Sequence, residues 1–369
     1  MSVRMKIAIS VLIDIFKTDG TTIRARRIAE IFKDRYNVVF VTRANKKHKL
    51  KGLEDIDVIA VKPDKTKLWN LKLIPVIMKN KFNIIYCSND WFGFISYYLL
   101  SKMYKYKLLF EAHSILSEEI KELRYNGIKV KLYQILERFV IKHADYVITL
   151  SENTFEFYKK YNKNIELIPV FIDETVFVNK EIGKRDYQKE ERKIGIIGPF
   201  DGMINKHFLE FLYGNLDRFD NRIHFIVIGK CDNKIENEKI AYTGYLETPQ
   251  DYANVLSSLN AVLVPYKIAT YGPLNKIIES MSCSLPVFTT PKGMVGLYYV
   301  EDGKDILVFE EHEIIDKVNE LIFDDKLMKE IGENARIVVE KYYSKKINEN
   351  KVINILESVA VVGETCSPP

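Results

Sequence analysis

Short apolar runs alternate with amphipathic helical patterns along most of the chain, and this alternation restricts the fold more than any other feature. In the first half the runs that predict strands are 5–12, 37–42, 58–61, 83–87, 107–110, 146–150 and 166–170. Segments such as 22–33 and 130–143 between them carry apolar residues at helical spacing. Continuous apolar strands separated by helices are typical of a parallel sheet covered on both faces.

A polar stretch interrupts this alternation once, and the pattern then starts again. The later runs that predict strands are 193–198, 222–229, 261–265, 286–289 and 306–309. We therefore predict an α/β protein of two Rossmann-like domains, with parallel sheets facing a central cleft. The predicted divisions are 1–178 for the N-terminal, acceptor-side domain, 179–192 for a polar linker, 193–340 for the donor domain, and 341–369 for a C-terminal helix and flexible tail. That helix either stays with the second domain or crosses back to the first.

Composition excludes several classes of protein. Of the 369 residues, 47% are hydrophobic and 28% charged, which is typical of a globular chain rather than a disordered one. A net charge of +5 requires neither nucleic acid nor a membrane as partner. The cysteines are scattered and no histidine accompanies them at metal-ligand spacing, so we expect neither disulfides nor a metal site. Without an apolar leader or a long apolar run, we expect a cytoplasmic protein.

The segment 261–297, AVLVPYKIATYGPLNKIIESMSCSLPVFTTPKGMVGL, carries the most chemistry. It predicts a strand, a loop with Gly272 and Pro273, a helix beginning near Leu274, a second strand and a glycine loop. A glycine loop at a helix N-terminus offers backbone N–H groups and a positive dipole end, which suit a phosphate. Lys276 and Glu279 share one face of this helix. They either serve a ligand or form an ordinary solvated pair.

This segment resembles the signature of the retaining, metal-independent glycosyltransferases of the GT-B fold, in the large family 4 (glycosyl transferases group 1). In that signature a first acid, a glycine-containing loop and a second acid precede a small-residue turn and a glycine loop. Glu279 matches the second acid, and Gly293 and Gly296 match the loop that follows. Tyr271 stands at the position of the first acid.

Further matches extend the resemblance over most of the chain. The segment LIPVFIDETVF (167–177) is similar to an interdomain motif of the family but has Val170 and Phe171 in place of Asn and Gly. KIGIIGPF (193–200) is similar to the strand and glycine that open the second domain. YTGYL (242–246) resembles the turn that takes the nucleobase.

The resemblance implies a nucleotide-diphosphate sugar as donor and no additional cofactor. In the family the second acid holds the donor ribose, while the amides of the loop and helix start hold the diphosphate. The donor-binding residues that it implies here are Gly20, Lys206, Tyr245, Leu246, Tyr271, Gly272, Pro273, Leu274, Lys276 and Glu279. Gly20 lies in DGTT (19–22), where the alternative is that the threonines only cap a helix.

The first half supplies the candidates for the transferred sugar and the acceptor. His113 follows a predicted parallel strand, where such folds place active groups, and in the family a histidine here lies beside the transferred sugar. Asp90 and Trp91 resemble a loop on the acceptor side. Asp90 either orients an acceptor hydroxyl or caps the helix that begins at Trp91.

The resemblance implies retaining transfer through an oxocarbenium-like state. Lysines and helix N-termini then stabilise the departing nucleoside diphosphate, whose phosphate takes the acceptor proton. No metal is implied. The acceptor is a glycan, a lipid-linked molecule or another hydroxyl compound, as in glycan biosynthesis.

The stretch 62–82, KPDKTKLWNLKLIPVIMKNKF, is rich in lysine and contains Trp69. One interpretation is a peripheral contact with the inner face of a membrane, which fits a lipid-linked acceptor. The other is an amphipathic helix packed on the sheet with lysines outward. No nucleic-acid recognition motif accompanies the lysines.

Two other functions stay open on the sequence. A catalytically silent nucleotide-sugar binding protein is consistent with Tyr271, with Val170 and Phe171, and with Pro199 and Phe200, where the family often has an arginine. A GT-B nucleotide-sugar epimerase is less consistent, because the carboxylate-rich site of that family is not evident.

Overall fold

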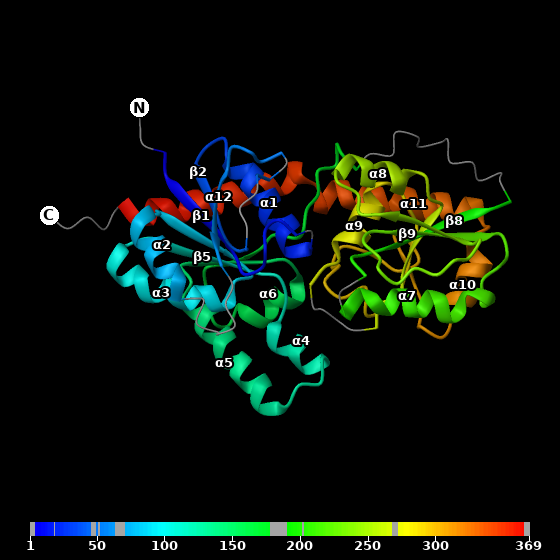
Figure 1. The fold of residues 1–369 in the computed structure, drawn as a ribbon, viewed down its shortest axis with the longest axis horizontal. Helices are drawn as coiled ribbons and strands as arrows, with labels where there is room; N and C mark the ends of the chain where they lie inside the picture. Colours follow the sequence, from blue (N-terminus) through cyan, green and yellow to red (C-terminus); the bar gives the residue numbers. More distant parts are fainter. Residues whose placement is uncertain are drawn as a thin grey trace. The chain divides into compact units, whose positions relative to one another are not determined.

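The computed structural model describes residues 4–17, 19–45, 49–50, 52–62, 71–177, 190–200, 203–267 and 272–364. The chain divides into two compact units: unit 1 is Met1–Ile168 with Glu349–Pro369, and unit 2 is Pro169–Asn348 (Figure 1). Each unit is α/β with one parallel sheet, which confirms the predicted fold class. The predicted domain limits stay predictions, since 178–189 and 365–369 lie outside the described residues.

Unit 1 is built on a parallel sheet with the strand order β3-β2-β1-β4-β5-β6-β7. Its strands are β1 (Lys6–Val11), β2 (Asn37–Arg43), β3 (Asp57–Val61), β4 (Ile84–Ser88), β5 (Lys107–Ala112), β6 (Tyr146–Thr149) and β7 (Ile165–Leu167). Every residue of β4 is buried, as expected for a strand covered on both faces. Each of these strands falls on a run that the sequence analysis predicts.

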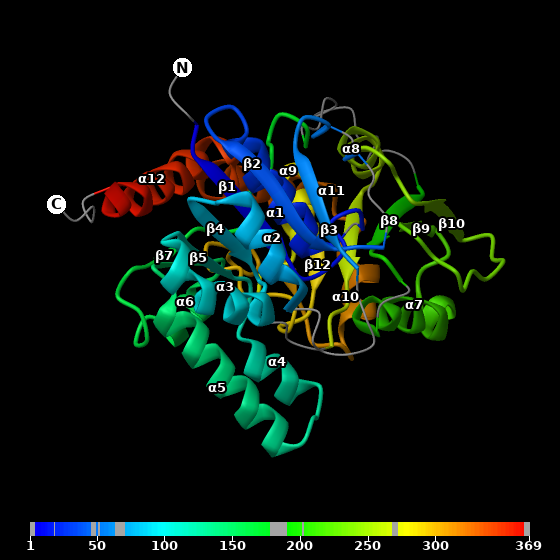
Figure 2. The ribbon, with the colours of Figure 1, turned by 60° about the vertical axis from the view of Figure 1, so that its left-hand side comes forward.

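Helices cover both faces of this sheet. They are α1 (Gly20–Phe32), α2 (Leu73–Asn80), α3 (Trp91–Tyr104), α4 (Leu116–Glu122), α5 (Gly127–His143) and α6 (Glu152–Tyr158). The helices α2, α3, α5 and α6 pack on one face through a cluster that includes Phe94, Tyr97 and Phe110. The other face carries α1 and the last helix, α12 (Lys345–Glu364), as Figures 1 and 2 show. The pair α4 and α5 projects from this body of unit 1.

Unit 2 is built on a second parallel sheet with the order β10-β9-β8-β11-β12-β13. Its strands are β8 (Arg192–Ile197), β9 (Ile223–Ile228), β10 (Ile240–Gly244), β11 (Ala261–Val264), β12 (Val287–Thr289) and β13 (Leu307–Val308). Its helices are α7 (Met203–Asn215), α8 (Pro249–Ser257), α9 (Asn275–Ser282), α10 (Ile314–Leu321) and α11 (Asp325–Val338), with short turns at Leu216–Arg218 and Val339–Tyr343. The helices α8, α9 and α11 lie on one side of the sheet, with α7 and α10 on the other (Figures 1 and 2).

One predicted turn is a strand. The segment 242–246, interpreted as a nucleobase-binding turn, includes the end of β10, which pairs in parallel with β9. Its residues Ala241 to Gly244 are exposed or half-buried, so β10 lacks the continuous apolar run that identifies the central strands. The start of α8 follows from its local sequence, because the Thr248 hydroxyl accepts a hydrogen bond from the Asp251 N–H and Pro249 occupies the first helical position.

Both sheets reverse their order beside their first strand. In unit 1 the chain moves outward from β1 to β2 and β3, then crosses to β4 on the other side. In unit 2 the same crossing joins β10 to β11, which lies next to β8. The helices that follow the two central strands diverge at such a point, which leaves space at the carboxyl ends of the strands. This reversal determines where each unit can hold a ligand.

We expect Gly332→Ala to destabilise unit 2. Gly332 is buried on α11, and a Cβ atom there would lie 2.3 Å from the carbonyl oxygen of Ser284, so backbone must move. Overpacking of this kind costs about 1–3 kcal/mol. The matched control is Gly214→Ala on α7, where a Cβ meets no atom within 4 Å.

Thermal and urea unfolding of both variants measure this difference. Because alanine has the higher helix propensity, the control should be neutral or more stable by up to about 1 kcal/mol. An unchanged unfolding midpoint for Gly332→Ala contradicts the close packing of α11 on the turn at Ser284.

Candidate functional site

His113 lies just beyond the carboxyl end of β5, beside the reversal point of unit 1. Its Nε2 is 2.8 Å from Oε1 of Glu111 and 3.3 Å from the Ser88 hydroxyl at the end of β4. Its Nδ1 is 3.4 Å from the hydroxyl of Thr21, in the first turn of α1. The side chain is 12% exposed. Two strand ends and one helix start therefore hold a single ring that still reaches solvent.

The fully buried carboxylate of Glu111 holds the His113 ring in place. Glu111 on β5 accepts hydrogen bonds from Nε of Arg24 at 3.0 Å and from the Tyr86 hydroxyl, in addition to the contact with His113. Burial alone raises the pKa of Glu111, but the charge of Arg24 and the bonds from His113 and Tyr86 lower it to about 2. An ionised Glu111 favours a hydrogen atom on Nε2 of His113, so that in the neutral imidazole Nδ1 is the acceptor. The sequence analysis missed Glu111 and Arg24, although a charged residue inside an apolar strand was a usable signal.

The start of α1 is the third part of this site. Asp19 is its N-cap and accepts hydrogen bonds from the N–H groups of Thr21 and Thr22, while the Thr22 hydroxyl accepts one from the Asp19 N–H. The sequence analysis gave the capping role to the threonines, whereas the N-cap is Asp19 and Thr22 completes its capping box. Gly20 is the first residue of the helix, so its backbone lies one residue from the Thr21 hydroxyl that faces His113.

Asp90 and Trp91 are core residues of unit 1. Asp90 is 0% exposed, caps α3 through the N–H of Gly93, and accepts a 2.6 Å hydrogen bond from the Ser10 hydroxyl. The structure thus shows the capping alternative for Asp90, and neither carboxylate oxygen is left for an acceptor. Trp91 is 3% exposed, packs against Phe110, and donates its indole hydrogen to Oδ1 of the neighbouring Asn89.

Asn89 is the half-buried residue of this loop, and the sequence analysis did not select it. It follows β4 with a φ of 54°, a left-handed conformation that asparagine tolerates better than most residues. Its Oδ1 accepts from Trp91 and lies 3.4 Å from the His113 N–H. Asn89 therefore accepts a hydrogen bond from the backbone of His113.

The second group of candidate residues lies at the reversal point of unit 2. Lys276, in the first turn of α9, donates hydrogen bonds of 2.8 Å to the carbonyl oxygen of Ile197 at the end of β8 and to Oδ1 of Asn205. Its ammonium lies 4.5 Å from the ring centroid of Phe208. Both hydrogen-bond acceptors are neutral, and burial lowers the pKa of Lys276 to about 7, with Glu279 acting weakly in the opposite direction.

Glu279, one turn further along α9, is 5% exposed. An ordinary solvated pair does not describe Lys276 and Glu279, since Glu279 is buried and the half-buried Lys276 donates to two neutral acceptors instead. No side chain caps α9 at its N-cap residue Leu274. A half-buried lysine and a helix start without a side-chain cap from Leu274 thus lie together, an arrangement that suits an anion.

The glycine loop packs against the start of α9. Gly296 has a φ of 90°, and a Cβ atom there would lie 2.7 Å from the nitrogen of Pro273 and 2.8 Å from the carbonyl carbon of Gly272. Only glycine combines that conformation with so close an approach of two backbones. Gly272 is buried, whereas Pro273 and Leu274 are half-buried, so the loop keeps part of its surface accessible.

The remaining donor candidates are surface residues of unit 2. Lys206 on α7 is 56% exposed and forms an ion pair with Glu210 at 3.4 Å. Tyr245, after β10, is 58% exposed, and Leu246 is half-buried. Tyr271 lies outside the described residues.

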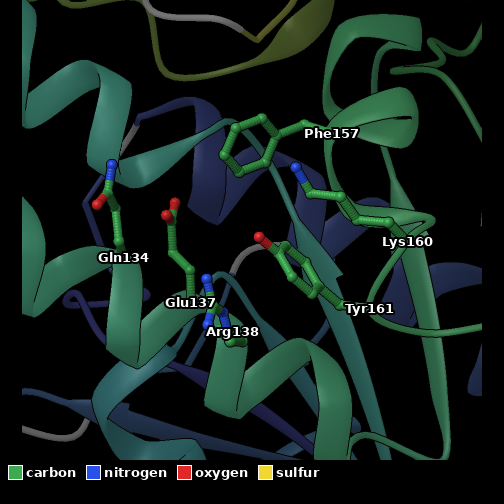
Figure 3. Close-up of a pocket in the computed structure, with 6 residues that line it drawn as sticks. All are labelled: Gln134, Glu137, Arg138, Phe157, Lys160 and Tyr161. Carbon is green, nitrogen blue, oxygen red and sulfur yellow. The ribbon is translucent and has the colours of Figure 1, made fainter.

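A small cavity in unit 1 lies apart from all the predicted residues. Figure 3 shows it between α5 and the end of α6, with a volume of about 230 Å³, lined by Gln134, Glu137, Arg138, Phe157, Lys160 and Tyr161. Glu137 is 2% exposed, accepts hydrogen bonds from the Tyr158 hydroxyl and the Ser117 N–H, and has its pKa raised by burial. The Tyr158 contact ties α5 to α6, which is a structural role.

Comparison with known proteins shows which sequence families and which fold this chain resembles. Residues 18–176 match the sequence profile described as Glycosyltransferase Family 4, and residues 191–324 match the one described as Glycosyl transferases group 1. An uncharacterized glycosyltransferase of Methanocaldococcus jannaschii is 27% identical over 186 residues, which cover 48% of this chain and 49% of that protein. The match thus spans about half of the relative.

Solved structures show the same fold over nearly the whole chain. Sucrose-phosphate synthase of Thermosynechococcus elongatus superposes with a TM-score of 0.79 at 16% identity, covering 97% of this chain and all of that one. Anabaena HepE in complex with UDP-glucose gives 0.73 at 17% identity, covering 96% and 100%. A glycosyltransferase of Rickettsia africae gives 0.71 at 17% identity, covering 96% and 98%. The fold is GT-B, and the family matches support a GT-B glycosyltransferase.

We expect Glu111→Gln to destabilise unit 1 by about 3 kcal/mol, because it leaves the Arg24 guanidinium buried without its counter-charge. The lowered pKa of Glu111 also predicts a pH dependence. The stabilisation by this carboxylate is complete above its unfolded pKa of about 4.5 and is lost as the pH falls toward 2. Unfolding free energies measured between pH 7 and pH 3 test both effects.

The double variant Arg24→Met with Glu111→Leu is the control, since it removes both buried charges together. It should lose less stability than the two single variants combined. Equal stability of Glu111→Gln and the wild type at pH 7 contradicts the role of this ion pair.

Proposed function

We propose that this protein is a retaining glycosyltransferase that moves a sugar from a nucleotide-diphosphate sugar to a hydroxyl acceptor. The observation that carries this proposal is the half-buried Lys276 and the buried Glu279 at the start of α9, next to the end of β8, where the N-cap residue Leu274 makes no side-chain cap. A lysine with two neutral acceptors beside an open helix N-terminus favours a dianionic group such as a diphosphate.

Each of these groups is assigned the part of the donor that its chemistry suits. Lys276 and the backbone N–H groups that follow the Gly272–Pro273 pair, beginning with that of Leu274, hold the diphosphate, and Glu279 accepts hydrogen bonds from the ribose hydroxyls. Lys206 adds a mobile positive charge from the surface of α7, and Tyr245 with Leu246 offers an apolar surface to the base. Tyr271 occupies the position at which the family's first acid approaches the transferred sugar.

In unit 1, His113 contacts the transferred sugar, together with the backbone at Gly20. Transfer breaks the bond between the anomeric carbon and the diphosphate oxygen and forms a bond from the same carbon to the acceptor oxygen. The departing phosphate takes the acceptor proton, so no protein base is required, and the positive charges of unit 2 stabilise the leaving group. No metal and no additional cofactor enter this scheme.

The acceptor in this proposal is a glycan or a lipid-linked molecule, and the location is the cytoplasm. In the described part of 62–82, α2 packs through Leu73 and Ile77, as the amphipathic alternative predicts. Trp69 lies outside the described residues. None of the described helices is both long and apolar enough to cross a membrane.

A silent nucleotide-sugar binding protein is the second candidate. It is favoured by Val170 and Phe171, which are buried where the family motif has Asn and Gly. Slow hydrolysis of a nucleotide sugar by the purified chain distinguishes an enzyme from this alternative. Binding without turnover, in the presence of a broad set of acceptors, favours the silent protein. The epimerase alternative predicts conversion of the free nucleotide sugar into its epimer.

We expect one nucleoside diphosphate, among UDP, GDP and ADP, to raise the melting temperature of the wild type. At a hundred times its Kd a ligand adds about 2.7 kcal/mol to the free energy of unfolding. UDP and UDP-glucose are tested first, because HepE, with the same fold, has been solved with UDP-glucose. Glu279→Ala should lose most of this rise, because the ribose hydroxyls lose their acceptor.

Glu320→Ala is the matched control, because this carboxylate lies on the surface of α10 and pairs with Lys317. It should keep the full rise. The donor site is assigned wrongly if no nucleotide stabilises the wild type, or if both variants respond like it.

Diphosphate binding should take up protons near neutral pH. With a pKa of about 7, Lys276 is half neutral in the free protein at pH 7, and an adjacent anion favours its charged form. Binding therefore draws up to about one proton from solution between pH 7 and 8, and the affinity falls as the pH rises further. Calorimetric titration with the nucleotide in two buffers of different ionisation enthalpy measures this uptake.

Lys276→Met should bind more weakly and show no uptake. A wild-type binding enthalpy that is the same in both buffers contradicts the assignment of Lys276 to the diphosphate.

A further inference from the structure

Large apolar side chains exposed on unit 1 gather on one group of helices. In the described part of this unit they all lie on or directly before α2, α3 and α5: Leu71, Met78, Phe92, Leu99, Met103, Tyr125, Ile128, Leu132 and Ile135. Single exposed apolar residues are common on proteins, but clusters of them mark interaction sites. The helices are neighbours in both views, since α3 lies between α2 and α5 (Figures 1 and 2).

The exposed residues form stripes along the helices. On α5, Ile128, Leu132 and Ile135 are spaced i, i+4, i+7 and are between 59% and 76% exposed. The opposite face of α5 buries Val140 and Ile141 in the core. This helix is thus apolar on both its inner and its outer side, whereas a helix side that faces only water is normally polar.

On α3 the same feature recurs one helix away. Leu99 and Met103, spaced i, i+4, are 64% and 73% exposed. An edge-to-face contact between Phe92 of α3 and Tyr133 of α5 joins the two helices. We call the outer surfaces of α3 and α5 the α3–α5 face.

The charges around this face have one sign. Between 116 and 143 the exposed charged residues are Lys121, Arg124, Lys131, Arg138 and Lys142. The acids of the same segment, Glu118, Glu119, Glu122 and Glu137, are half-buried or buried. The segment 91–107 contains no acid and has Lys102 and Lys105 exposed.

The basic residues of α5 also lie together on one side of its apolar stripe. At 100° per residue, Lys131, Arg138 and Lys142 follow one another along one flank of the stripe made by Ile128, Leu132 and Ile135. Apolar residues flanked by bases are the pattern of a helix that lies in the interface of an anionic bilayer, with its apolar side among the acyl chains.

We propose that the α3–α5 face binds the surface of an anionic phospholipid bilayer. Each basic residue is attracted to the lipid phosphates, and the apolar stripe enters the boundary between headgroups and acyl chains. The projection of α4 and α5 from unit 1 leaves this surface accessible to a flat partner (Figure 2). The inference deepens the proposed function by selecting a membrane-held acceptor, but its test needs no turnover.

Flotation of the full-length protein with lipid vesicles tests the proposal. The vesicles are phosphatidylcholine alone, or phosphatidylcholine with about a third phosphatidylglycerol. We expect binding to the anionic vesicles, weakened by salt, and little binding to the neutral ones. The triple variant Ile128→Ser, Leu132→Ser, Ile135→Ser should bind at least about tenfold more weakly, because its serines bring no apolar surface out of water into the bilayer.

The controls lie on α11 of unit 2. Ile337 is 59% exposed, the same as Ile135, so Ile337→Ser is compared with Ile135→Ser. To test the basic residues, the double variant Lys131→Glu, Lys142→Glu is compared with the double variant Lys326→Glu, Lys329→Glu. The α5 variants should lose binding, and the α11 variants should keep it. Unchanged melting temperatures show that the α5 variants are folded.

Three results overturn the proposal. They are no flotation with anionic vesicles, equal flotation with both kinds, and equal loss in the α5 and α11 variants. Concentration-dependent dimers without lipid that the serine variant abolishes assign the face to a second copy of this chain instead. Nucleotide binding in unit 2 is measured separately, so failure here leaves the proposed transfer standing.

Discussion

The reversal of strand order in each sheet is the constraint on which the other features of this protein depend. A right-handed crossover from β3 to β4, or from β10 to β11, takes the chain across the first strand to its other side. The helices after the two central strands must then lie on opposite faces, and the carboxyl ends between them stay uncovered. His113 with the start of α1 occupies this position in unit 1, and Lys276 with the end of β8 occupies it in unit 2.

At each reversal point a charged group is withdrawn from water, although charged groups are usually exposed. The two units compensate for this in different ways. In unit 1 the carboxylate of Glu111 has an opposite charge in Arg24, so it stays ionised to low pH and holds one nitrogen of His113. In unit 2 the two acceptors of the Lys276 ammonium among the described residues are neutral, and burial lowers its pKa to about 7. The first arrangement is complete without a ligand and orients a ring. The second gains most when an anion arrives, which is the difference expected between a positioning group and a binding group.

The local sequence pattern was sufficient to predict the central strands and helices with a capping residue. It was not sufficient to predict the partners of the polar residues. The central strands were predictable because they are buried on both sides, and α8 because Thr248 and Pro249 act within one turn. The edge strand β10 was missed, since an edge with half-buried residues has no apolar run. The burial of Lys276 could not be predicted from its neighbours, because its acceptors Ile197 and Asn205 lie far away in sequence.

The same distinction separates the lysine-rich stretch 62–82 from the α3–α5 face as candidates for a membrane contact. The stretch 62–82 has the higher density of lysine, yet α2 within it puts Leu73 and Ile77 into the core, as an ordinary amphipathic helix does. In α5 the bases are sparser, but the isoleucines and the leucine between them stay outside. A membrane contact needs apolar area left exposed after folding as well as positive charge, and only the packing of α5 on α3 shows which apolar residues are left over. The tertiary structure therefore carries this inference, and the sequence supplies only its charges.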